Sequence, residues 1–298
     1  MTDLDLRDLL ESWMLALKVE HKADNTLKLY RAGVEQYIDW CAAEKLTPML
    51  ERNQVRAWIS TLIDADAEPA TAAARQSAVK RLSKWLLAED ELDIDPLAGL
   101  RPPTQKEKLV QPLTEDELKA LLKACSGKAF GDRRDTAVIR ILMDTGLRPG
   151  EVAALELRDV DLGAGLVTVR KSKTGKGRVV HAGPATCAAV DRWLRIRRTH
   201  KLADSPMLWL GIRSRGFGYA AMYEALKARA VEAGIDRRFH PHLFRHTAAT
   251  RWLAAGGSEG GAQASMGWSS RRMLDRYVRA TASQRAAEEA RRLNLGDL

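Results

Sequence analysis

The stretch from residue 242 to 277 holds side chains that could act together on a phosphate group. His242 and Arg245 are three residues apart, so on a helix an imidazole and a guanidinium would share one face and could converge on a small anion. Further upstream, Arg148 stands at a predicted helix boundary, after a glycine has broken the apolar run 137–143. Two arginines at these places could bind one phosphodiester.

A basic segment lies between Arg148 and His242. Residues 166–169 and 179–180 are short apolar runs, and basic residues and glycines separate them. This pattern predicts a β-hairpin with a mobile, cationic tip. The lysines of the tip are Lys171, Lys173 and Lys176.

Taken in order, these motifs resemble those of the tyrosine recombinases, also called the phage integrase family, which include the Xer-type enzymes. Any one of the motifs is weak, but their order makes chance agreement improbable. The resemblance covers most of the chain and is strongest in its second part. It rests on Arg148 in TGLRPGE, Lys173 in SKTGKG, His242 and Arg245 in HPHLFRHTAAT, Trp268 in MGWSS, and Tyr277 nine residues after the tryptophan.

The resemblance implies that Tyr277 is the nucleophile. A phenol has an ordinary pKa near 10, so its attack on a phosphodiester requires positive charge and hydrogen-bond donors at the phosphate. Arg148 and Arg245 can supply both, and donors that are already in place stabilise the charge that develops in the transition state. We expect this chemistry to need neither a metal ion nor another cofactor, and no ATP.

Other residues that match the family motifs are expected to transfer protons. Lys173 is similar to the general acid of the family, with Lys171 and Lys176 as rival candidates. His242 would assist proton transfer at the tyrosine or the phosphate, because it titrates nearest neutrality. Trp268 stands where many members have histidine, and an indole can donate a hydrogen bond but cannot carry a proton. We therefore expect Trp268 to serve in contact and packing.

Two further site questions stay open at this level. Glu151 matches an acidic position that supports the active site in the family, where it could orient the first arginine or the histidine. It could equally be a first-turn acid that interacts with a helix dipole. The histidines His240, His242 and His246 lack a cysteine or acidic residue at metal-ligand spacing, so a metal site is disfavoured and His246 is predicted to be structural.

Composition favours a polyanionic partner. The 298 residues carry a net charge of +9 with a pI near 9.6, which indicates nucleic acid or an anionic membrane surface. No apolar run reaches spanning length and no secretory signal opens the chain, so we expect a protein of the bacterial cytoplasm, associated with DNA. The cysteines, Cys41, Cys125 and Cys187, are too widely spaced for a metal motif and are predicted to be buried apolar groups.

The chain is predicted to fold as mainly α-helical with a small β-sheet, in two domains, and the resemblance implies that these domains close on DNA as a clamp. Residues 1–100 are expected to form a helical core-type DNA-binding domain, 101–112 a linker, and 113–298 the catalytic domain with a C-terminal tail helix. The first 100 residues hold 12 basic and 18 acidic residues, a net charge of −6, so the remainder carries +15. One helix of the first domain has a basic face formed by Arg75, Lys80, Arg81 and Lys84. This face could contact DNA, although a face that is merely solvated is as good an interpretation.

Local signals predict where several helices begin. Asp24, with the two residues after it, and Asn53 are expected to cap the second and third helices, and Pro69 to start the fourth. Thr114 and Glu117 form a predicted capping box at the start of the second domain.

A glycine-rich stretch and the two ends of the chain lead to further predictions. The glycine-rich stretch 256–265 stands where relatives have a helix with larger apolar residues, so we expect weak packing that leaves Trp268 and Tyr277 poorly placed until DNA or a neighbouring subunit orders them. Residues 284–294 resemble the tail helix that docks on an adjacent protomer. Because the first helix starts by about Leu4, we expect no separate arm-binding domain and only short recombination sites.

The resemblance thus implies a site-specific DNA recombinase that forms a 3′-phosphotyrosyl intermediate at Tyr277. Its expected partners are double-stranded recombination sites, with two protomers on each site and a tetramer in synapsis. A type IB-like topoisomerase would share the chemistry but reseal the same strand. A non-catalytic DNA-binding protein would be expected to have lost Arg148, Arg245 or Tyr277, and all of these are present.

Overall fold

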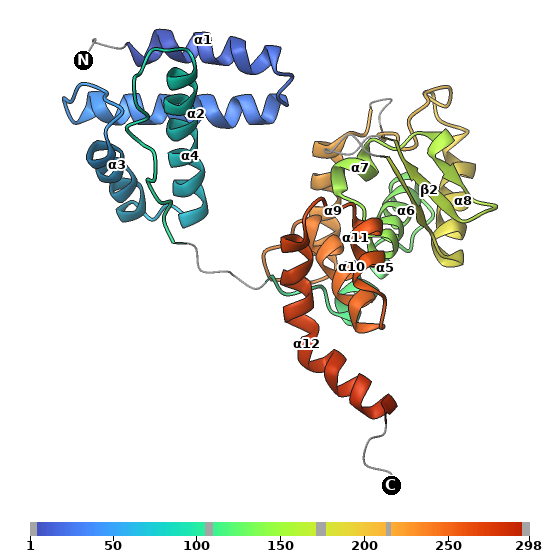
Figure 1. Ribbon diagram of the computed structural model, residues 1–298. Helices are drawn as coiled ribbons and strands as arrows, with labels where there is room; N and C mark the ends of the chain where they lie inside the picture. The colour runs from blue at the N-terminus through green and yellow to red at the C-terminus, as the bar shows by residue number, and fades with distance from the viewer. Residues whose placement is uncertain (1–4, 105–109, 171–176, 213–215, 294–298) are drawn as a thin grey trace. The chain divides into compact units, whose positions relative to one another are not determined.

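The computed structural model describes residues 5–104, 110–170, 177–212 and 216–293. The chain divides into two compact units, unit 1 at Met1–Lys108 and unit 2 at Leu109–Leu298 (Figure 1). Within the described residues no helix is both long and apolar enough to cross a membrane.

Unit 1 consists of helices whose apolar side chains recur at three- and four-residue intervals. They are α1 (Leu6–Val19), α2 (Asp24–Ala43), α3 (Arg52–Asp64) and α4 (Pro69–Ala88). Trp13, Tyr37 and Trp58 are among the aromatic residues buried between them. α2 and α4 pack closely, because a Cβ on Gly33 of α2 would lie only 2.5 Å from the Cβ of Ala78 in α4.

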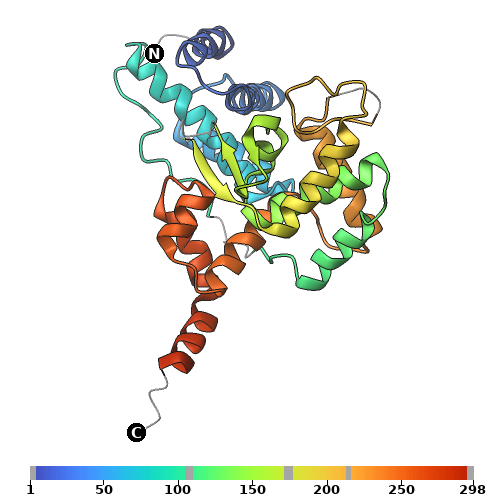
Figure 2. The same cartoon turned by 90° about the vertical axis from the view of Figure 1, so that its right-hand side faces the viewer.

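Unit 2 is also mainly helical, with its core around α6. Figures 1 and 2 show α10, α11 and α12 together at the C-terminal end of the chain, with the far end of α12 extending away from its neighbours. The helices are α5 (Glu115–Ala124), α6 (Phe130–Thr145), α7 (Pro149–Ala153), the 3₁₀ helix η1 (Leu157–Asp159), α8 (Pro184–Arg197), α9 (Tyr219–Glu232), α10 (His242–Ala254), α11 (Glu259–Met266) and α12 (Arg271–Leu293).

A small antiparallel sheet completes unit 2. Its strands are β1 (Val160–Asp161), β2 (Leu166–Val169) and β3 (Arg178–His181), in the order β1-β2-β3. β2 and β3 form the predicted hairpin, with Val167 opposite Val180 and both buried. Its tip, with Lys171, Lys173 and Lys176, lies outside the described residues. The predicted fold class, mainly α with a small sheet, is confirmed.

The helix starts show where local signals succeed. Thr114 Oγ1 accepts the Glu117 N–H at 3.1 Å, and Glu117 Oε2 accepts the Thr114 N–H at 2.7 Å, which confirms the capping box. The predicted caps at Asp24 and Asn53 are wrong, because α2 begins at Asp24 and α3 begins at Arg52. The side chains of Asp24 and Asn53 therefore lie inside the first turn, and the N-cap position is occupied by the residue before each helix.

The glycine-rich stretch differs most from expectation. It forms α11, which Ser258 caps by accepting the Gly261 N–H at 3.0 Å. Ala262 and Met266 of this helix are buried in a small apolar cluster that α10 and α12 complete. The expectation of weak packing is wrong for these two side chains, because the helix buries one narrow face and needs no large residue elsewhere.

Candidate active site

Arg148 lies in the turn between α6 and α7. Gly146 ends α6 in the left-handed conformation, with φ of 62°, and a Cβ at this position would come within 2.6 Å of the Met266 sulfur. Glycine therefore allows α11 to approach this turn. Arg148 Nη1 donates to Glu151 Oε1 at 2.9 Å, and Nη2 donates to the Gly267 carbonyl at 3.2 Å.

Glu151 is a buried carboxylate that joins two arginines. Its oxygens accept the Arg148 backbone N–H at 2.8 Å and Arg148 Nη1, and they accept Nη1 and Nη2 of Arg178 at 3.0 and 2.6 Å. Burial would raise the pKa of Glu151, but the hydrogen bonds from Arg178 and Arg148 outweigh it and hold the pKa below its ordinary value. Glu151 is thus an acid in the first turn of α7, as one interpretation expects, and it also orients the side chain of Arg148, as the other expects.

Arg178, at the start of β3, was not singled out from the sequence. Its side chain is 10% exposed and its Nε donates to the Ser265 carbonyl at 2.8 Å, in addition to the paired bonds to Glu151. It therefore ties the base of the hairpin to both α7 and α11. A signal was available in the sequence, because an arginine directly before an apolar strand must direct its charge toward a partner or toward solvent.

Arg245 lies in the first turns of α10 and is 5% exposed. Its Nη1 donates to the Gly146 carbonyl at 3.0 Å and its Nη2 to the Met266 carbonyl at 2.5 Å. Burial, followed by the nearby charge of Arg148, lowers the pKa of Arg245 to about 10. The two carbonyl groups satisfy part of its donor capacity, but burial and the neighbouring Arg148 still disfavour the charge of Arg245, and an added anion would offset this.

The C-terminal end of α11 brings these side chains together. Three consecutive carbonyl groups, those of Ser265, Met266 and Gly267, accept from Arg178, Arg245 and Arg148 in that order. The end of a helix carries partial negative charge and unpaired carbonyls, which guanidinium groups can satisfy. The two arginines that sequence analysis assigned to one phosphate are thus held at adjacent backbone positions.

Two aromatic side chains, Trp268 just after α11 and Tyr277 in α12, lie stacked on each other. Their rings stack, with centroids 5.1 Å apart and planes 15° apart, and both residues are about 95% buried, with exposures of 4% and 5%. The Arg245 guanidinium lies 5.6 Å from the Trp268 ring centre. Among the described residues the Trp268 indole N–H has no hydrogen-bond acceptor. The structure therefore places both aromatic residues, contrary to the expectation that they need DNA or a neighbour for order.

His246, predicted to be structural, contacts the candidate nucleophile. The hydroxyl of Tyr277 lies 2.6 Å from Nδ1 of His246. His242, at the start of α10, is exposed, yet protein surrounds enough of its ring to disfavour charge. That partial burial, and then the nearby His240, Arg245 and Arg148, lowers the pKa of His242. His242 is therefore neutral near pH 7.

The basic side chains predicted to bind DNA in unit 1 lie on α4. Lys80 donates to the Leu100 carbonyl at 2.6 Å, and the Arg81 guanidinium lies 5.4 Å from the centre of the Tyr30 ring. These two side chains therefore also stabilise unit 1, whereas Lys84 is exposed. Contact with DNA stays a prediction for all four side chains: Arg75, Lys80, Arg81 and Lys84.

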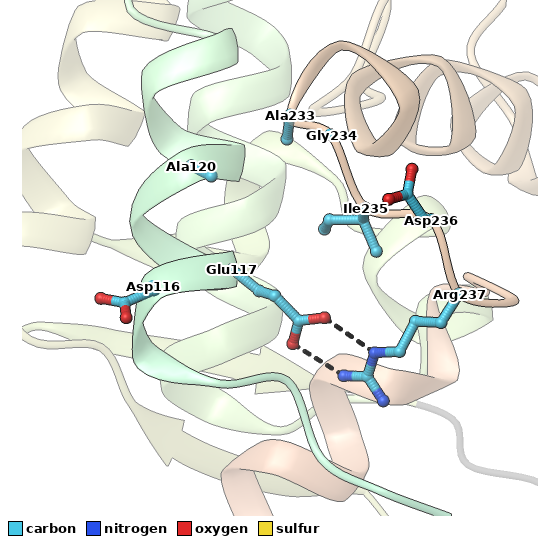
Figure 3. Close-up of a pocket in the computed structure, with 8 residues that line it drawn as sticks. All are labelled: Asp116, Glu117, Ala120, Ala233, Gly234, Ile235, Asp236 and Arg237. Carbon is cyan, nitrogen blue, oxygen red and sulfur yellow. Dashed lines mark hydrogen bonds and ion pairs between the residues drawn. The ribbon is translucent and has the colours of Figure 1, made fainter.

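A separate pocket lies between α5 and the connection from α9 to α10 (Figure 3). An ion pair crosses it, with Arg237 Nε 2.8 Å from Glu117 Oε1. Arg237 also donates to the carbonyls of Gln111 and Pro112, so it fastens the segment that precedes α5. None of the predicted catalytic residues lines this pocket. Across the described residues, no group of three or more histidine, cysteine or acidic side chains is placed to hold a metal ion.

Comparison with protein-family models decides the family. Residues 111–284 match the phage integrase family, and residues 9–92 match the phage integrase N-terminal SAM-like domain. The chain belongs to the phage integrase family. The predicted resemblance is confirmed, and this phage integrase family member is a tyrosine recombinase, an enzyme that cleaves and rejoins DNA at specific sites.

Similar proteins agree over most of this integrase's length. Tyrosine recombinase XerC of Xanthomonas campestris pv. campestris is 30% identical over 266 residues, which cover 87% of this chain and 80% of the relative. Tyrosine recombinase XerD of Mycobacterium leprae is 29% identical over 276 residues, covering 86% and 87%. Among solved structures, XerA recombinase has a TM-score of 0.55 at 25% identity, covering 96% and 98%. XerH site-specific recombinase has a TM-score of 0.73 at 19% identity, covering 89% and 79%.

Proposed function

We propose that this recombinase cuts one DNA strand per subunit through Tyr277 and holds the cut strand as a 3′-phosphotyrosyl link. The freed 5′-hydroxyl of a partner duplex then attacks this link and completes the exchange. The observation that supports the proposal best is the convergence of Arg148, Arg245, Trp268 and Tyr277 at the C-terminal end of α11. Because bond energy is kept in the protein link, we expect the reaction to need neither ATP nor a metal ion.

In the proposed mechanism the arginines bind the scissile phosphate. The lowered pKa of Arg245 fits a site that is completed by an anion, since a phosphate would offset the neighbouring charge of Arg148. The buried Trp268 N–H is a donor that a phosphate oxygen could satisfy. Glu151 and Arg178 would hold Arg148 in place while negative charge grows on the phosphate.

Proton transfer at the leaving group is the proposed task of Lys173. An alkoxide is a poor leaving group, so the 5′-oxygen needs a proton as the phosphorus–oxygen bond breaks. Lys171 and Lys176 remain rival general acids, since the tip of the hairpin lies outside the described residues. His242, neutral near pH 7, could donate a hydrogen bond to the phosphate without adding charge.

The assembly proposed for this chain follows its relatives. Solved structures with similar folds include a lambda integrase dimer bound to a core site and a lambda integrase tetramer bound to a Holliday junction. We infer two protomers on each recombination site and a tetramer in synapsis, acting in the bacterial cytoplasm. Residues 1–100 would form the core-type DNA-binding domain, 101–112 the linker, and 113–298 the catalytic domain with its tail helix.

Replacement of Tyr277 by phenylalanine tests the proposed function. The substitution removes the attacking oxygen and keeps the ring that stacks on Trp268, so DNA affinity should stay within about threefold of wild type while covalent complex disappears. The assay uses a nicked DNA site that traps the adduct, which is resolved on a denaturing gel. Adduct that persists in Tyr277→Phe would place the nucleophile elsewhere.

The same preparations separate recombination from simple relaxation. Purified protein joined covalently to genomic DNA can be mapped to find the sites, and pairs of those sites can be cloned in one plasmid. Strand exchange between the two sites is the expected result. Relaxation of supercoils without exchange would instead indicate a topoisomerase that reseals the same strand.

A further inference from the structure

The hydroxyl of the proposed nucleophile contacts a histidine that the proposed mechanism has not used. Tyr277 Oη lies 2.6 Å from His246 Nδ1, which is within hydrogen-bond distance. The two ring centres are 5.5 Å apart, with planes 38° apart. The residues come from α10 and α12, which pack directly on each other. The contact therefore joins two elements of the same small apolar cluster that holds Trp268.

The surroundings of Tyr277 restrict where its proton can go. The residue is 5% exposed and the Trp268 ring covers one face of the phenol, so bulk water has little access. Two described side chains at this end of the site are donors that cannot take the proton: the Trp268 indole has an N–H, and Arg245 carries a guanidinium that has no acceptor atom. A neutral imidazole, in contrast, has one nitrogen that accepts a proton.

We propose that His246 is the general base that activates Tyr277. This inference rests on the function proposed above and adds a reacting group to it. In the tautomer with hydrogen on Nε2, Nδ1 carries a lone pair and, at 2.6 Å from the phenol oxygen, can accept its proton. As the tyrosine oxygen bonds to phosphorus, the proton moves from Oη to Nδ1, and the bond from phosphorus to the 5′-oxygen breaks. The proton that this leaving oxygen gains comes from the general acid at the hairpin.

The reverse step uses the same proton. When a 5′-hydroxyl attacks the phosphotyrosyl link, it gives its proton to the conjugate base of the general acid and bonds to phosphorus. The bond from phosphorus to Tyr277 Oη breaks, and the imidazolium of His246 returns its proton to the leaving phenolate. One histidine thus serves as base in cleavage and as acid in rejoining, as microscopic reversibility requires. No oxidant, metal ion or added nucleophile enters either step.

Replacement of His246 by asparagine is the direct test. The asparagine oxygen can occupy a place close to that of Nδ1 and accept the Tyr277 hydrogen bond, but an amide does not take up a proton. Single-turnover cleavage is measured at saturating DNA, so that a change in affinity does not contribute. We expect cleavage to fall by about 100-fold or more, the lower end of general-base effects, with DNA affinity within about threefold of wild type.

A substrate with sulfur in place of the 5′-bridging oxygen separates base from acid. A thiolate leaves without a proton because its conjugate acid is far stronger than an alcohol. A Lys173→Met variant should therefore regain cleavage on this substrate if Lys173 is the acid, while His246→Asn should stay as slow relative to wild type as on normal DNA. Recovery of His246→Asn to the wild-type rate would place His246 at the leaving group and overturn the proposal.

His200→Asn is the matched control. His200 also uses Nδ1 as an acceptor, for the Leu202 N–H at 3.1 Å, but it stacks on Phe130 and has no contact with Tyr277 among its hydrogen bonds. This variant should cleave at close to the wild-type rate. A loss of less than tenfold in His246→Asn, or a gain, would refute the base. If His246→Asn does not fold, as judged by its melting temperature and DNA binding, His246→Gln is assessed by the same thresholds.

The outcomes also separate this inference from the function it rests on. Absence of covalent adduct in the wild-type protein, or its persistence in Tyr277→Phe, would defeat the proposed function. Normal adduct in wild type, none in Tyr277→Phe and unimpaired cleavage in His246→Asn would leave the function standing and defeat the proposed base.

Discussion

Arg178→Met should weaken unit 2 well beyond the loss of a surface ion pair. The side chains of Arg178 and Glu151 are 10% and 8% exposed, and the arginine donates two hydrogen bonds to this carboxylate and one to the Ser265 carbonyl. Removing one partner of a buried ion pair costs about 3–5 kcal/mol. Because Arg148 continues to donate to Glu151, we expect the lower end, about 3 kcal/mol.

Thermal unfolding of the full-length chain measures this effect. For a unit of this size, about 3 kcal/mol corresponds to a fall of roughly 6–12 °C in the melting temperature of the transition that contains unit 2. Strand cleavage should fall as well, since Glu151 and the Ser265 carbonyl would lose the side chain that joins them, and Arg148 would be held less firmly. The control is Arg195→Met, which breaks an exposed pair with Asp191 one turn away on α8 and should change stability by less than about 0.5 kcal/mol. Equal melting temperatures for the two variants would refute the reasoning.

Three further variants test the rest of the site. Arg245→Lys keeps a charge but loses the planar fork that reaches two carbonyls, so cleavage at saturating DNA should fall by about tenfold or more with little change in binding; near-normal cleavage would show that any cation suffices. In denaturant titrations between pH 7.5 and 5, His242→Asn should lose less free energy of unfolding than wild type. The pKa of His242 in the folded protein lies below its ordinary value, so in wild type the unfolded state binds more protons as pH falls through 6.5. Equal losses in the two proteins would contradict the lowered pKa of His242. Gly267→Ala should lower the melting temperature and the cleavage rate more than Gly234→Ala. Both glycines have positive φ, but a Cβ at Gly267 would lie 3.0 Å from the guanidinium of Arg178, whereas a Cβ at Gly234 would meet nothing within 4 Å. Equal effects of the two substitutions would exclude the contact with Arg178.

The sequence predicted the fold where side-chain periodicity and turn chemistry agree. The hairpin of β2 and β3, the capping box at Thr114 and the start of α4 at Pro69 rest on local signals that tertiary contacts do not oppose. The caps at Asp24 and Asn53 failed because several polar residues follow one another there, and packing of the apolar face selects which of them begins the helix.

The candidate site was predictable as a set of residues but not as a set of contacts. The spacing of His242 and Arg245 on one helix follows from helical geometry. In contrast, the contact between His246 and Tyr277 joins residues 31 positions apart, and that between Arg178 and Ser265 joins residues 87 apart. Such pairs depend on how α10, α11 and α12 pack, which the glycine-rich sequence of α11 made appear weaker than it is.

The bonds at the end of α11 make one short helix a common support for the site. α11 has eight residues, two of them glycine after the Ser258 cap, so its intrinsic helix propensity is low. If this helix opened locally, the carbonyls that hold Arg148, Arg178 and Arg245 would be released in a single event. The lifetime of the assembled site is then limited by the opening rate of α11, and amide hydrogen exchange in this helix would report how often the recombinase is ready to cut.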